Sequence, residues 1–573
     1  MSKRKASKAI LSQPDTKRPD VKPTCTIAID FGTAGTGYAY CFAGSDVIEA
    51  KQPGGQDARK TLTNILLNDD ESFAAFGYDA RRQYSETGKG LFFSNYKMLL
   101  SNVDGAAGET MAQALNGKRV RLMDVISKTI TYVKDEALKE CGRALPNGIR
   151  ANECQWVLTI PAIWSDKAKG FMRKAAYQAG LIEEQDSRRL LLALEPESAA
   201  ICCDIGQLVT AGQTFMVLDT GGGTVDITMN RLQSSSPLRL HEVQAPSGGP
   251  WGSTFVDNRF EEFVGDLVGQ KSFDALKATA YWIELLENWE NVKTSQTADE
   301  STRTLNFSPT LEVLDDGVKL ADLVDTYNTT HGASLKMRGR STIVMDAAFA
   351  RRFFKNTMEK IVTHCEHLLG SDPVNYIFLV GGFAESELLQ SLIKSRFDSP
   401  RCKVIVPVRP SLAVLRGAVL FGVNQDVFAS RVARFTYGFC QSEPYNAALP
   451  LHSIASPIVR ETYDGRKVPY VDDIFLPLVK VGDKLPAGHT ASRSGYRTFA
   501  KNQSKMAFQI FSTPLGSINF TTDNSARQIG TATINCNQHQ SAEIKLEFGA
   551  TEISARAYNE STGEQVQVQL RYD

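Results

Sequence analysis

Short runs of apolar residues alternate along most of the chain with longer segments in which apolar residues recur at helical spacing. The run from Val157 to Ile160, for example, predicts a buried strand. The segment from Lys167 to Ala179 that follows it predicts an amphipathic helix. Because this alternation continues from Thr24 to about Val427, it predicts lobes of mixed α/β structure.

The same pattern suggests how this α/β region, residues 24–428, is divided. We expect a first lobe over about 24–212, which the chain rejoins over 403–428. The apolar segment from Ser411 to Phe421 predicts the helix that closes this lobe. A second lobe is expected over about 213–402.

The pattern changes after about Ala429 to short alternating segments such as KMAFQIF and EIKLEF, separated by turn residues. Segments of this kind predict a β-sandwich, which we place at residues 429–573. The sequence ends at Asp573 without a helical period after its last strand, so we expect no helical lid on this domain.

The first 23 residues form a basic tail that is too poor in apolar residues to fold alone. It contains seven lysines and arginines but only two acidic residues, Asp15 and Asp20. Two basic clusters, KRK and KR, are compatible with a nuclear address, and the alternative is a solvated, disordered arm.

Composition is typical of a folded globular chain, with 573 residues, 42% of them hydrophobic and 22% charged. The 64 basic and 64 acidic residues balance, so no global field draws the chain to nucleic acid or to a membrane. The ten cysteines have no spacing typical of zinc or disulfide frameworks. No apolar stretch approaches the roughly 18 residues of a membrane helix, and no secretory signal is visible, so we expect a cytoplasmic protein.

Two loops carry the same candidate chemistry, IAIDFGTAGTGYA and FMVLDTGGGTVDITM. Each is an apolar strand that ends in an aspartate and breaks into glycines before a second strand, which predicts a hairpin tip. Glycine has no Cβ, so successive backbone N–H groups can converge on phosphate oxygens, and threonine adds a hydroxyl. The candidate phosphate-binding residues are Gly32, Thr33, Gly35, Gly221, Gly222, Gly223 and Thr224.

The aspartates of these loops suggest a cation beside the phosphates. Asp30, Asp219 and Asp226 are hard oxygen ligands at strand ends, suited to holding a hydrated Mg²⁺ through its waters. One such loop alone is an ordinary turn, but two copies predict a nucleotide cleft between similar halves. A third strand ends in Gly381 and Gly382, where a bare backbone would let adenosine lie flat, before a helix expected to begin near Glu385 or Ser386.

These three segments, in this order, resemble the actin-like ATPase superfamily and, within it, the seventy-kilodalton heat-shock chaperones. Between the loops, WVLTIPAIWSDKAKGFMRKAAYQAGL and LLLALEPESAA are similar to the family's crossover strand, helix and second strand. Details such as GYAYCF and VGGFAES resemble the divergent twelfth group of the family more than its abundant members. The resemblance implies a duplicated, ribonuclease H-like domain of two lobes, followed by a peptide-binding β-domain.

The resemblance also implies cofactors and roles. ATP or ADP would bind with Mg²⁺, which Asp30, Asp219, Asp226 and Glu195 would hold; Glu195 would lie in the outer shell. The implied catalytic set is Asp30, Lys97, Glu195, Asp219, Thr224 and Asp226. The implied adenosine side comprises Glu290, Lys293, Gly381, Gly382 and Phe383.

Each of these roles has a simpler alternative. Glu195 precedes a proline and could cap the helix that begins there. Lys97 could be a solvated lysine, and Asp226 could be a structural hydrogen-bond acceptor. Glu290 and Lys293 could form an ordinary surface ion pair at i, i+3 spacing.

The chain also departs from the family pattern. Ala34 replaces a threonine of the first loop, and FASRVARFTYGF replaces the family's acidic, leucine-rich connector between domains. A proline and an arginine that report nucleotide state in the chaperones correspond here to Pro161 and Lys169. Lysine lacks the planar fork of arginine, so the sequence leaves the coupling between domains open.

The resulting hypothesis is an ATP-binding, slowly hydrolysing, chaperone-like protein. It would be a weak ATPase whose residues 429–573 engage protein clients or signalling partners in a nucleotide-dependent way. The alternatives are a nucleotide-gated scaffold or adaptor without productive turnover, and a small-molecule kinase of the same superfamily. The resemblance leaves open whether nucleotide-exchange or co-chaperone partners exist.

Overall fold

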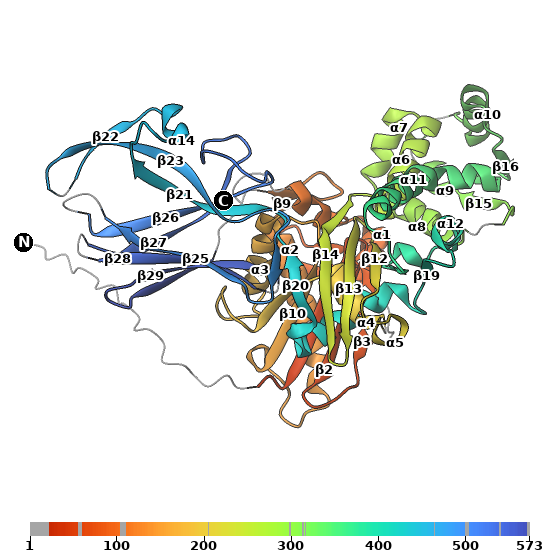
Figure 1. The fold of residues 1–573 in the computed structure, drawn as a ribbon. Coiled ribbons are helices and arrows are strands. Elements are labelled where there is room, and N and C mark those ends of the chain that lie inside the picture. The colour runs from red at the N-terminus through yellow and green to blue at the C-terminus, as the bar shows by residue number, and fades with distance from the viewer. Residues whose placement is uncertain are drawn as a thin grey trace, which may run out of the picture.

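The computed structural model describes residues 22–569 apart from 56–59, 103–109, 204, 297–298, 312–313, 316, 463, 499–502, 538–539 and 550. Two α/β halves lie beside each other, and the C-terminal strands form a separate body next to helix α3 (Asp166–Gln178) (Figure 1). The predicted basic tail, except its last two residues, lies outside the described residues. The prediction of mixed α/β structure is confirmed.

The sheet of the first half has the strand order β11-β10-β1-β2-β3. Strands β1 and β2 form an antiparallel hairpin, and β1, β10 and β11 run parallel. These strands are β1 (Cys25–Phe31), β2 (Gly35–Phe42), β3 (Glu49–Lys51), β10 (Cys154–Ile160) and β11 (Leu190–Leu194).

The sheet of the second half repeats this topology, with the order β19-β18-β12-β13-β14. Strands β12 and β13 form the hairpin, and β12, β18 and β19 run parallel. These strands are β12 (Thr214–Thr220), β13 (Val225–Ser235), β14 (Leu238–Gly249), β18 (Tyr376–Val380) and β19 (Lys403–Ile405). The two halves are therefore duplicates that place equivalent hairpin tips at equivalent sheet edges.

Alternation along the strands explains the packing, because successive side chains point to opposite faces of a sheet. Ile27 and Ile29 of β1 face the first hydrophobic core, whereas Ala28 faces a core between the two sheets. Phe215 and Val217 reach this central core from the second sheet. Helices α4 (Glu195–Cys202) and α13 (Ala413–Val423) cross within it.

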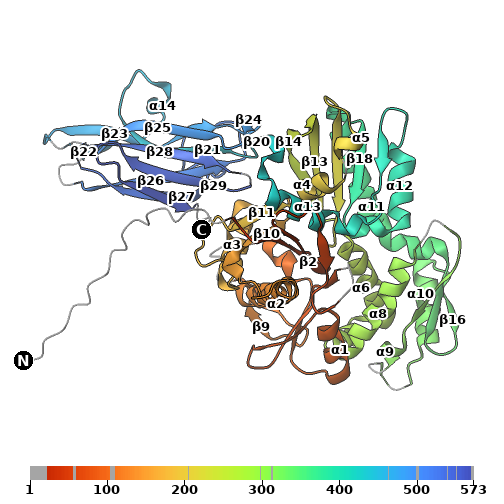
Figure 2. The same ribbon diagram turned by 90° about the horizontal axis from the view of Figure 1, so that it is seen from below.

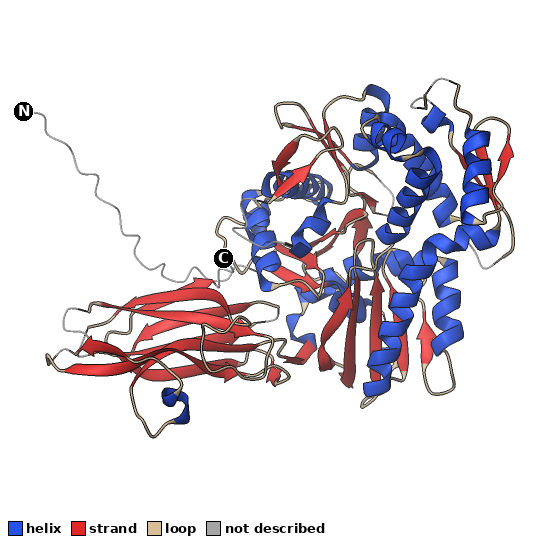
Figure 3. Cartoon of the chain, turned by 90° about the horizontal axis from the view of Figure 1, so that it is seen from above, coloured by secondary structure: helices blue, strands red, loops and turns tan. Residues whose placement is uncertain are grey.

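The remaining helices cover the outer faces (Figure 3). Those of the first half are α1 (Gly77–Thr87) and α2 (Leu122–Gly142); the short helix α5 (Ile205–Leu208) instead packs on β13 of the second sheet, with Ile205 in the central core. Those of the second half are α6 (Thr254–Val268), α7 (Gln270–Lys277), α8 (Ala280–Thr294), α9 (Ser308–Leu311), α10 (Leu320–His331), α11 (Ala347–Ser371) and α12 (Glu387–Phe397). Among the described residues, no helix is both long and apolar enough to cross a bilayer.

The halves also meet at their outer ends, where α1 lies beside α8 (Figure 2). Ile283 of α8 is buried in a small apolar cluster with Leu66, Tyr84 and Phe92 of the first half. Small sheets complete these ends: β5 (Ile65–Leu67), β6 (Phe73–Phe76) and β7 (Leu91–Phe93); β8 (Met111–Gln113) and β9 (Arg119–Arg121); β15 (Arg303–Asn306), β16 (Lys336–Arg338) and β17 (Thr342–Met345).

Strand pairing differs from the expected boundaries at three strands: β19, β20 and β24 (Lys484–Pro486), the last of which pairs with β20. The sequence places residues 403–428 in the first lobe, but β19 at 403–405 pairs with β18 of the second sheet. Strand β20 (Phe428–Val432) lies at the start of the predicted C-terminal domain, yet it pairs with β14 and continues the second sheet. A helix between parallel strands returns the chain to the same sheet, which explains β19 following β18 and α12.

The C-terminal residues form a five-stranded and a four-stranded antiparallel sheet. The first comprises β22 (Ile458–Glu461), β23 (Lys467–Val479), β21 (Thr436–Pro444), β26 (Lys505–Thr513) and β27 (Arg527–Asn535). The second comprises β25 (Thr490–Arg497), β28 (Ser541–Phe548), β29 (Ile553–Asn559) and β30 (Gln565–Gln569). Phe439, Ile510 and Leu546 belong to one core that both sheets share.

Candidate functional site

The two glycine loops have the same backbone turn. In the first, the N–H of Gly32 donates to the carbonyl of Gly35 at 3.2 Å. In the second, the N–H of Gly221 donates to the carbonyl of Thr224 at 2.9 Å. The sequence repeat therefore corresponds to a structural repeat at the ends of β1 and β12.

The tips of these loops face one another directly. A methyl carbon added to Gly222 would lie 2.7 Å from the Cβ of Ala34. One added to Gly223 would lie 2.5 Å from the Oγ1 of Thr33 and closer still to the sulfur of Met98. The close approach requires glycine at both positions, because the second loop packs against side chains of the first half.

Neighbouring segments hold the carbonyl groups of both tips. Thr63 donates from Oγ1 to the carbonyl of Gly32 at 2.7 Å. The N–H groups of Ser253 and Thr254 donate to the carbonyls of Gly221 and Gly222 at 3.1 and 2.9 Å. The carbonyls are thereby turned toward protein donors.

The N–H groups at the tips are left for a ligand. Within the described part of the chain, the N–H groups of Thr33, Ala34, Gly222 and Gly223 donate no hydrogen bond. Convergent backbone N–H groups without partners form a cradle for an anion. This is the arrangement that the glycine-rich sequences predict.

Carboxylates line the strand ends below the tips. Asp30 is 2% exposed; Thr159 donates to its Oδ1 at 2.9 Å, and the ammonium of Lys60 lies 2.5 Å from its Oδ2. Asp219 and Asp226 lie directly opposite each other on β12 and β13.

Asp226 is held from the first half of the molecule. Its Oδ1 accepts a hydrogen bond of 2.9 Å from the N–H of Ile163. Its Oδ2 is buried and has no hydrogen-bond partner within the described residues. Leaving a buried carboxylate oxygen without a hydrogen bond costs free energy. This oxygen is therefore suited to accept a hydrogen bond from a bound water.

Lys97 and Glu195 form an ion pair of 2.8 Å. Lys97 is 2% exposed and its ammonium lies 5.1 Å from the ring centre of Trp164, so the alternative of a solvated lysine is wrong. Glu195 is the first residue of α4, and its carboxylate binds Lys97 from there.

The charges of these carboxylates act on one another. Burial, together with Asp30 and Asp226, raises the pKa of Glu195 to about 7 against the opposing effect of Lys97. Burial, followed by the charge of Glu195, raises the pKa of Asp219 well above its usual range. Burial also raises the pKa of Asp226, although a hydrogen bond from Thr224 opposes it. The structure therefore brings all four predicted metal-site residues together.

This arrangement fits a hydrated Mg²⁺. Among the described residues, no three acidic, histidine or cysteine side chains converge closely enough to coordinate a metal directly. Mg²⁺ commonly keeps several waters and takes the rest of its ligands from phosphates. The buried carboxylate oxygens and the neighbouring anion cradle suit this mode of binding.

The third glycine segment adjoins the carboxylates. Gly381 has a φ of +94°, and a methyl carbon there would lie 2.4 Å from the Oδ1 of Asp219. A methyl carbon on Gly382 would meet no atom of the described residues within 4 Å, so the space beside it is open among them. A short 3₁₀ turn, Phe383–Glu385, separates these glycines from α12, which begins at Glu387.

Phe383 does not present its side chain to the site. Its ring is 5% exposed, belongs to the core of the second half, and stacks on Phe354 with the ring centres 6.3 Å apart. The ring completes the core under the turn, so the predicted contact of Phe383 with the cofactor stays a prediction and would have to use the backbone.

Lys293 is more constrained than a surface ion pair. Its ammonium lies 2.8 Å from the carboxylate of Glu290 and 2.9 Å from that of Asp257. Asp257 also accepts a hydrogen bond from the indole of Trp289. Because Asp257 lies one turn after Thr254, which braces the second tip, α6 connects Lys293 to the loop.

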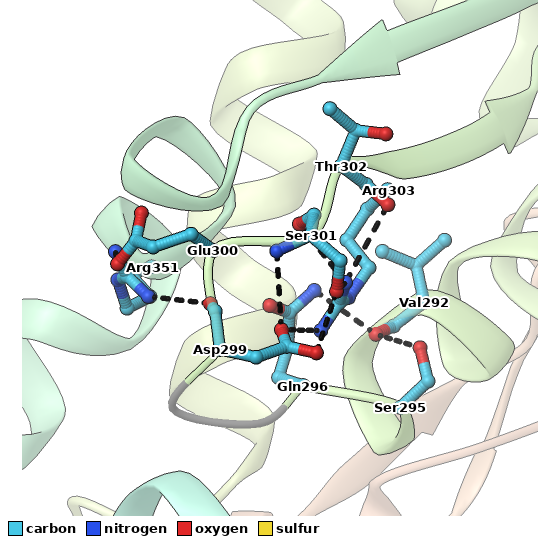
Figure 4. A network of polar contacts seen from close by, with 9 residues as sticks. All are labelled: Val292, Ser295, Gln296, Asp299, Glu300, Ser301, Thr302, Arg303 and Arg351. Carbon is cyan, nitrogen blue, oxygen red and sulfur yellow. Dashed lines mark hydrogen bonds and ion pairs between the residues drawn. The ribbon is translucent and has the colours of Figure 1, made fainter.

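A polar network fixes the end of the helix that carries Glu290 and Lys293 (Figure 4). Gln296 donates to the carbonyl of Val292 at 3.2 Å, which satisfies a carbonyl of the last turn. Arg303 of β15 pairs with Asp299 at 2.9 Å, and Arg351 of α11 pairs with Glu300 at 2.7 Å.

Sequence reasoning missed two charged residues of the site, Lys60 and Asp257. Lys60 precedes the two-residue strand β4 (Thr61–Leu62), and Asp257 lies in an ordinary amphipathic helix. Neither lies in a recognisable motif, so the sequence carried no signal for them.

Comparison with known proteins identifies relatives over nearly the whole chain. Heat shock 70 kDa protein 12A of Homo sapiens is 28% identical over 95% of this chain and 91% of its own length. Heat shock 70 kDa protein 12B of Homo sapiens is 28% identical over 98% of this chain and 94% of its own length. Chaperone protein DnaK of Metamycoplasma hominis is 23% identical over 76% of this chain and 65% of its own length. No family model matches the sequence. The predicted resemblance to this family and its twelfth group is confirmed.

Proposed function

We propose that this chain, a relative of the heat shock 70 kDa proteins, binds ATP and ADP between its two halves and hydrolyses ATP slowly. Residues 429–573 are proposed to act as a β-sandwich domain that engages protein partners according to the bound nucleotide. The relatives support a chaperone-like family, and the site supports the nucleotide.

The observation that carries this proposal is the pair of facing tips above buried carboxylates. The N–H groups of Thr33, Ala34, Gly222 and Gly223 supply donors from both halves to one phosphate chain. Gly382 has open space beside it, where adenosine could lie against the backbone. One nucleotide could therefore contact both halves at once.

The side chains have distinct proposed roles. Asp30, Asp219 and Asp226 would hold Mg²⁺ through its waters, and Glu195 would lie in the outer shell. When bound with the nucleotide, Mg²⁺ neutralises charge on the phosphates. Lys97, buried and fixed by Glu195, stabilises the charge that develops on the transferred phosphoryl group.

Direct contacts support communication with the C-terminal domain. Arg173 of α3 binds the carboxylate of Glu552 at 2.7 and 2.5 Å. Thr551 donates to the carbonyl of Leu192 at 2.5 Å, and Lys169 donates to the carbonyl of Thr551 at 3.2 Å. Lys169 lacks a planar guanidinium that can bond two acceptors at once. Arg173, one helical turn later on α3, supplies that group.

A single-turnover assay of ATP hydrolysis tests the enzymatic part. We expect slow hydrolysis by the wild-type chain and none by Asp30→Ala, whereas Asp79→Ala should behave as wild type because its side chain is an exposed surface ion-pair partner. Equal rates for the wild type and Asp30→Ala would remove the enzymatic claim.

The scaffold alternative has one observation in its favour, namely that protein groups already engage both carboxylate oxygens of Asp30. Saturable nucleotide binding with no hydrolysis would select it. Transfer of a radiolabelled phosphoryl group from ATP to a metabolite would instead favour a kinase.

A further inference from the structure

We propose that Lys60 is a built-in cation of the carboxylate cluster and that it competes with Mg²⁺ for Asp30. This inference rests on the proposed nucleotide site. It adds that Mg²⁺ must displace a lysine of the chain in order to approach Asp30. It concerns a residue that lies outside both glycine loops.

Both carboxylate oxygens of Asp30 lie next to protein groups. The ammonium of Lys60 lies 2.5 Å from Oδ2, and Thr159 donates to Oδ1 at 2.9 Å. Oδ2 accepts no hydrogen bond within the described residues, but the ammonium of Lys60 lies directly beside it, so water held by a metal ion can reach Asp30 only if Lys60 or Thr159 moves. Thr159 lies within a central strand, so Lys60, on a flexible stem, is the partner that can move.

The first hairpin, formed by β1 and β2, determines where the side chain of Lys60 lies. A methyl carbon on Gly35 would lie 3.2 Å from the Cβ of Lys60, and one on Gly37 would lie 3.2 Å from its Cγ. The stem of the lysine therefore runs across two glycines of β2, where larger residues would crowd it. Thr61 and Leu62 pair with β2 in a fixed register, and this pairing positions the preceding residue, Lys60, beside Asp30.

Charge explains why a cation is held there. Lys97 lies beside Glu195, and Lys60 lies beside Asp30, so the two carboxylates that the first half contributes each have an ammonium beside them. The charges of Asp219 and Glu195 also act on Lys60. An ammonium so close to a carboxylate lowers the attraction of that carboxylate for a second cation.

Two consequences follow. Nucleotide should bind without Mg²⁺ to a measurable extent, because a cation is already present in the cluster. Replacing Lys60 by an uncharged residue should raise the affinity for Mg²⁺ by about tenfold or more, the usual scale for changes in groups that contact metal-site residues.

The test compares Lys60→Met with Lys51→Met. Lys51 is a matched control, because its side chain is 20% exposed against 19% for Lys60, and it pairs with Glu140 outside the carboxylate cluster. ADP binding by the full chain is measured against Mg²⁺ concentration. We expect the half-maximal Mg²⁺ concentration to fall about tenfold in Lys60→Met and to stay unchanged in Lys51→Met.

A second readout needs no nucleotide. Binding of Mn²⁺, followed by electron paramagnetic resonance, should be tighter in Lys60→Met and in Lys60→Gln than in the wild type. An unchanged or higher half-maximal Mg²⁺ concentration, with unchanged Mn²⁺ binding, would overturn the role of Lys60. Absence of ADP binding at every Mg²⁺ concentration would overturn the proposed function instead, and the Mn²⁺ measurement would still decide the role of Lys60.

Discussion

Arg434 and Asp226 are joined through a single residue, Ile163. The guanidinium of Arg434 donates to the carbonyl of Ile163 at 3.2 Å, and the N–H of Ile163 donates to Asp226 at 2.9 Å. Arg434 also binds the carbonyls of Ala162 and Trp164. A carboxylate of the candidate site is thereby linked to the first residues of the C-terminal region.

This link predicts that Arg434→Ala uncouples the C-terminal region from the nucleotide. Nucleotide should change the protection of residues 428–436 against limited proteolysis in the wild type, and this change should disappear in the variant. Arg497→Ala, on an exposed arginine of β25, is the control and should keep it. If Arg434→Ala responds to nucleotide as the wild type does, coupling does not use this residue.

The ion pair between Arg173 and Glu552 predicts a contribution to docking of the C-terminal sheets. Glu552→Gln should weaken the docked state by about 1–2 kcal/mol, because it removes a charge-assisted bond whose carboxylate is 33% exposed. Small-angle scattering should then show a larger radius of gyration. Glu461→Gln, on the exposed edge strand β22, should leave the radius unchanged; a shared change would argue against a specific contact.

The contact between the tips predicts that Gly222→Ala lowers ADP affinity at least about tenfold, because the added methyl forces Ala34 and its loop apart. Gly370→Ala meets no atom within 4 Å and serves as the control. Calorimetric titration measures both. Equal affinities in the two variants would mean that the tips do not hold the phosphates.

Stability should depend on pH through Glu242, whose carboxylate accepts a hydrogen bond from the N–H of Val432. Burial, and then the charge of Glu197, raises the pKa of Glu242 from 4.5 to about 8. The folded chain therefore holds a proton that the unfolded chain has lost, so stability should fall as pH rises between these values.

Glu242→Gln should remove that part of the pH dependence, which is on the order of a few kcal/mol. Calorimetric melting temperatures from pH 5 to pH 9 measure it, with the exposed Glu284→Gln as the control. A slope in Glu242→Gln as steep as that of the wild type would show that other groups cause the dependence.

Local sequence was sufficient for the parts of the site that local geometry determines. An aspartate at a strand end, followed by glycines, specifies a hairpin tip whatever surrounds it, so both tips could be predicted. The repeat of this pattern also predicted that Asp30 and Asp219 occupy equivalent positions.

Features that depend on distant pairing were not predictable. Lys60 reaches Asp30 only because β4 pairs with β2 in one register. The buried ring of Phe383 depends on Phe354, which a sequence pattern does not place beside it. Strand β20 joins the second sheet through β14, nearly two hundred residues earlier in the chain, and no local signal marks that partner.

The central claim is that the two facing tips bind the phosphates of one nucleotide, and a calorimetric comparison of ADP with adenosine tests it most directly. The account predicts one ADP per chain, bound far more tightly than adenosine, because the phosphates receive N–H groups from both tips. Adenosine binding as tightly as ADP, or no saturable binding of ADP, would contradict it.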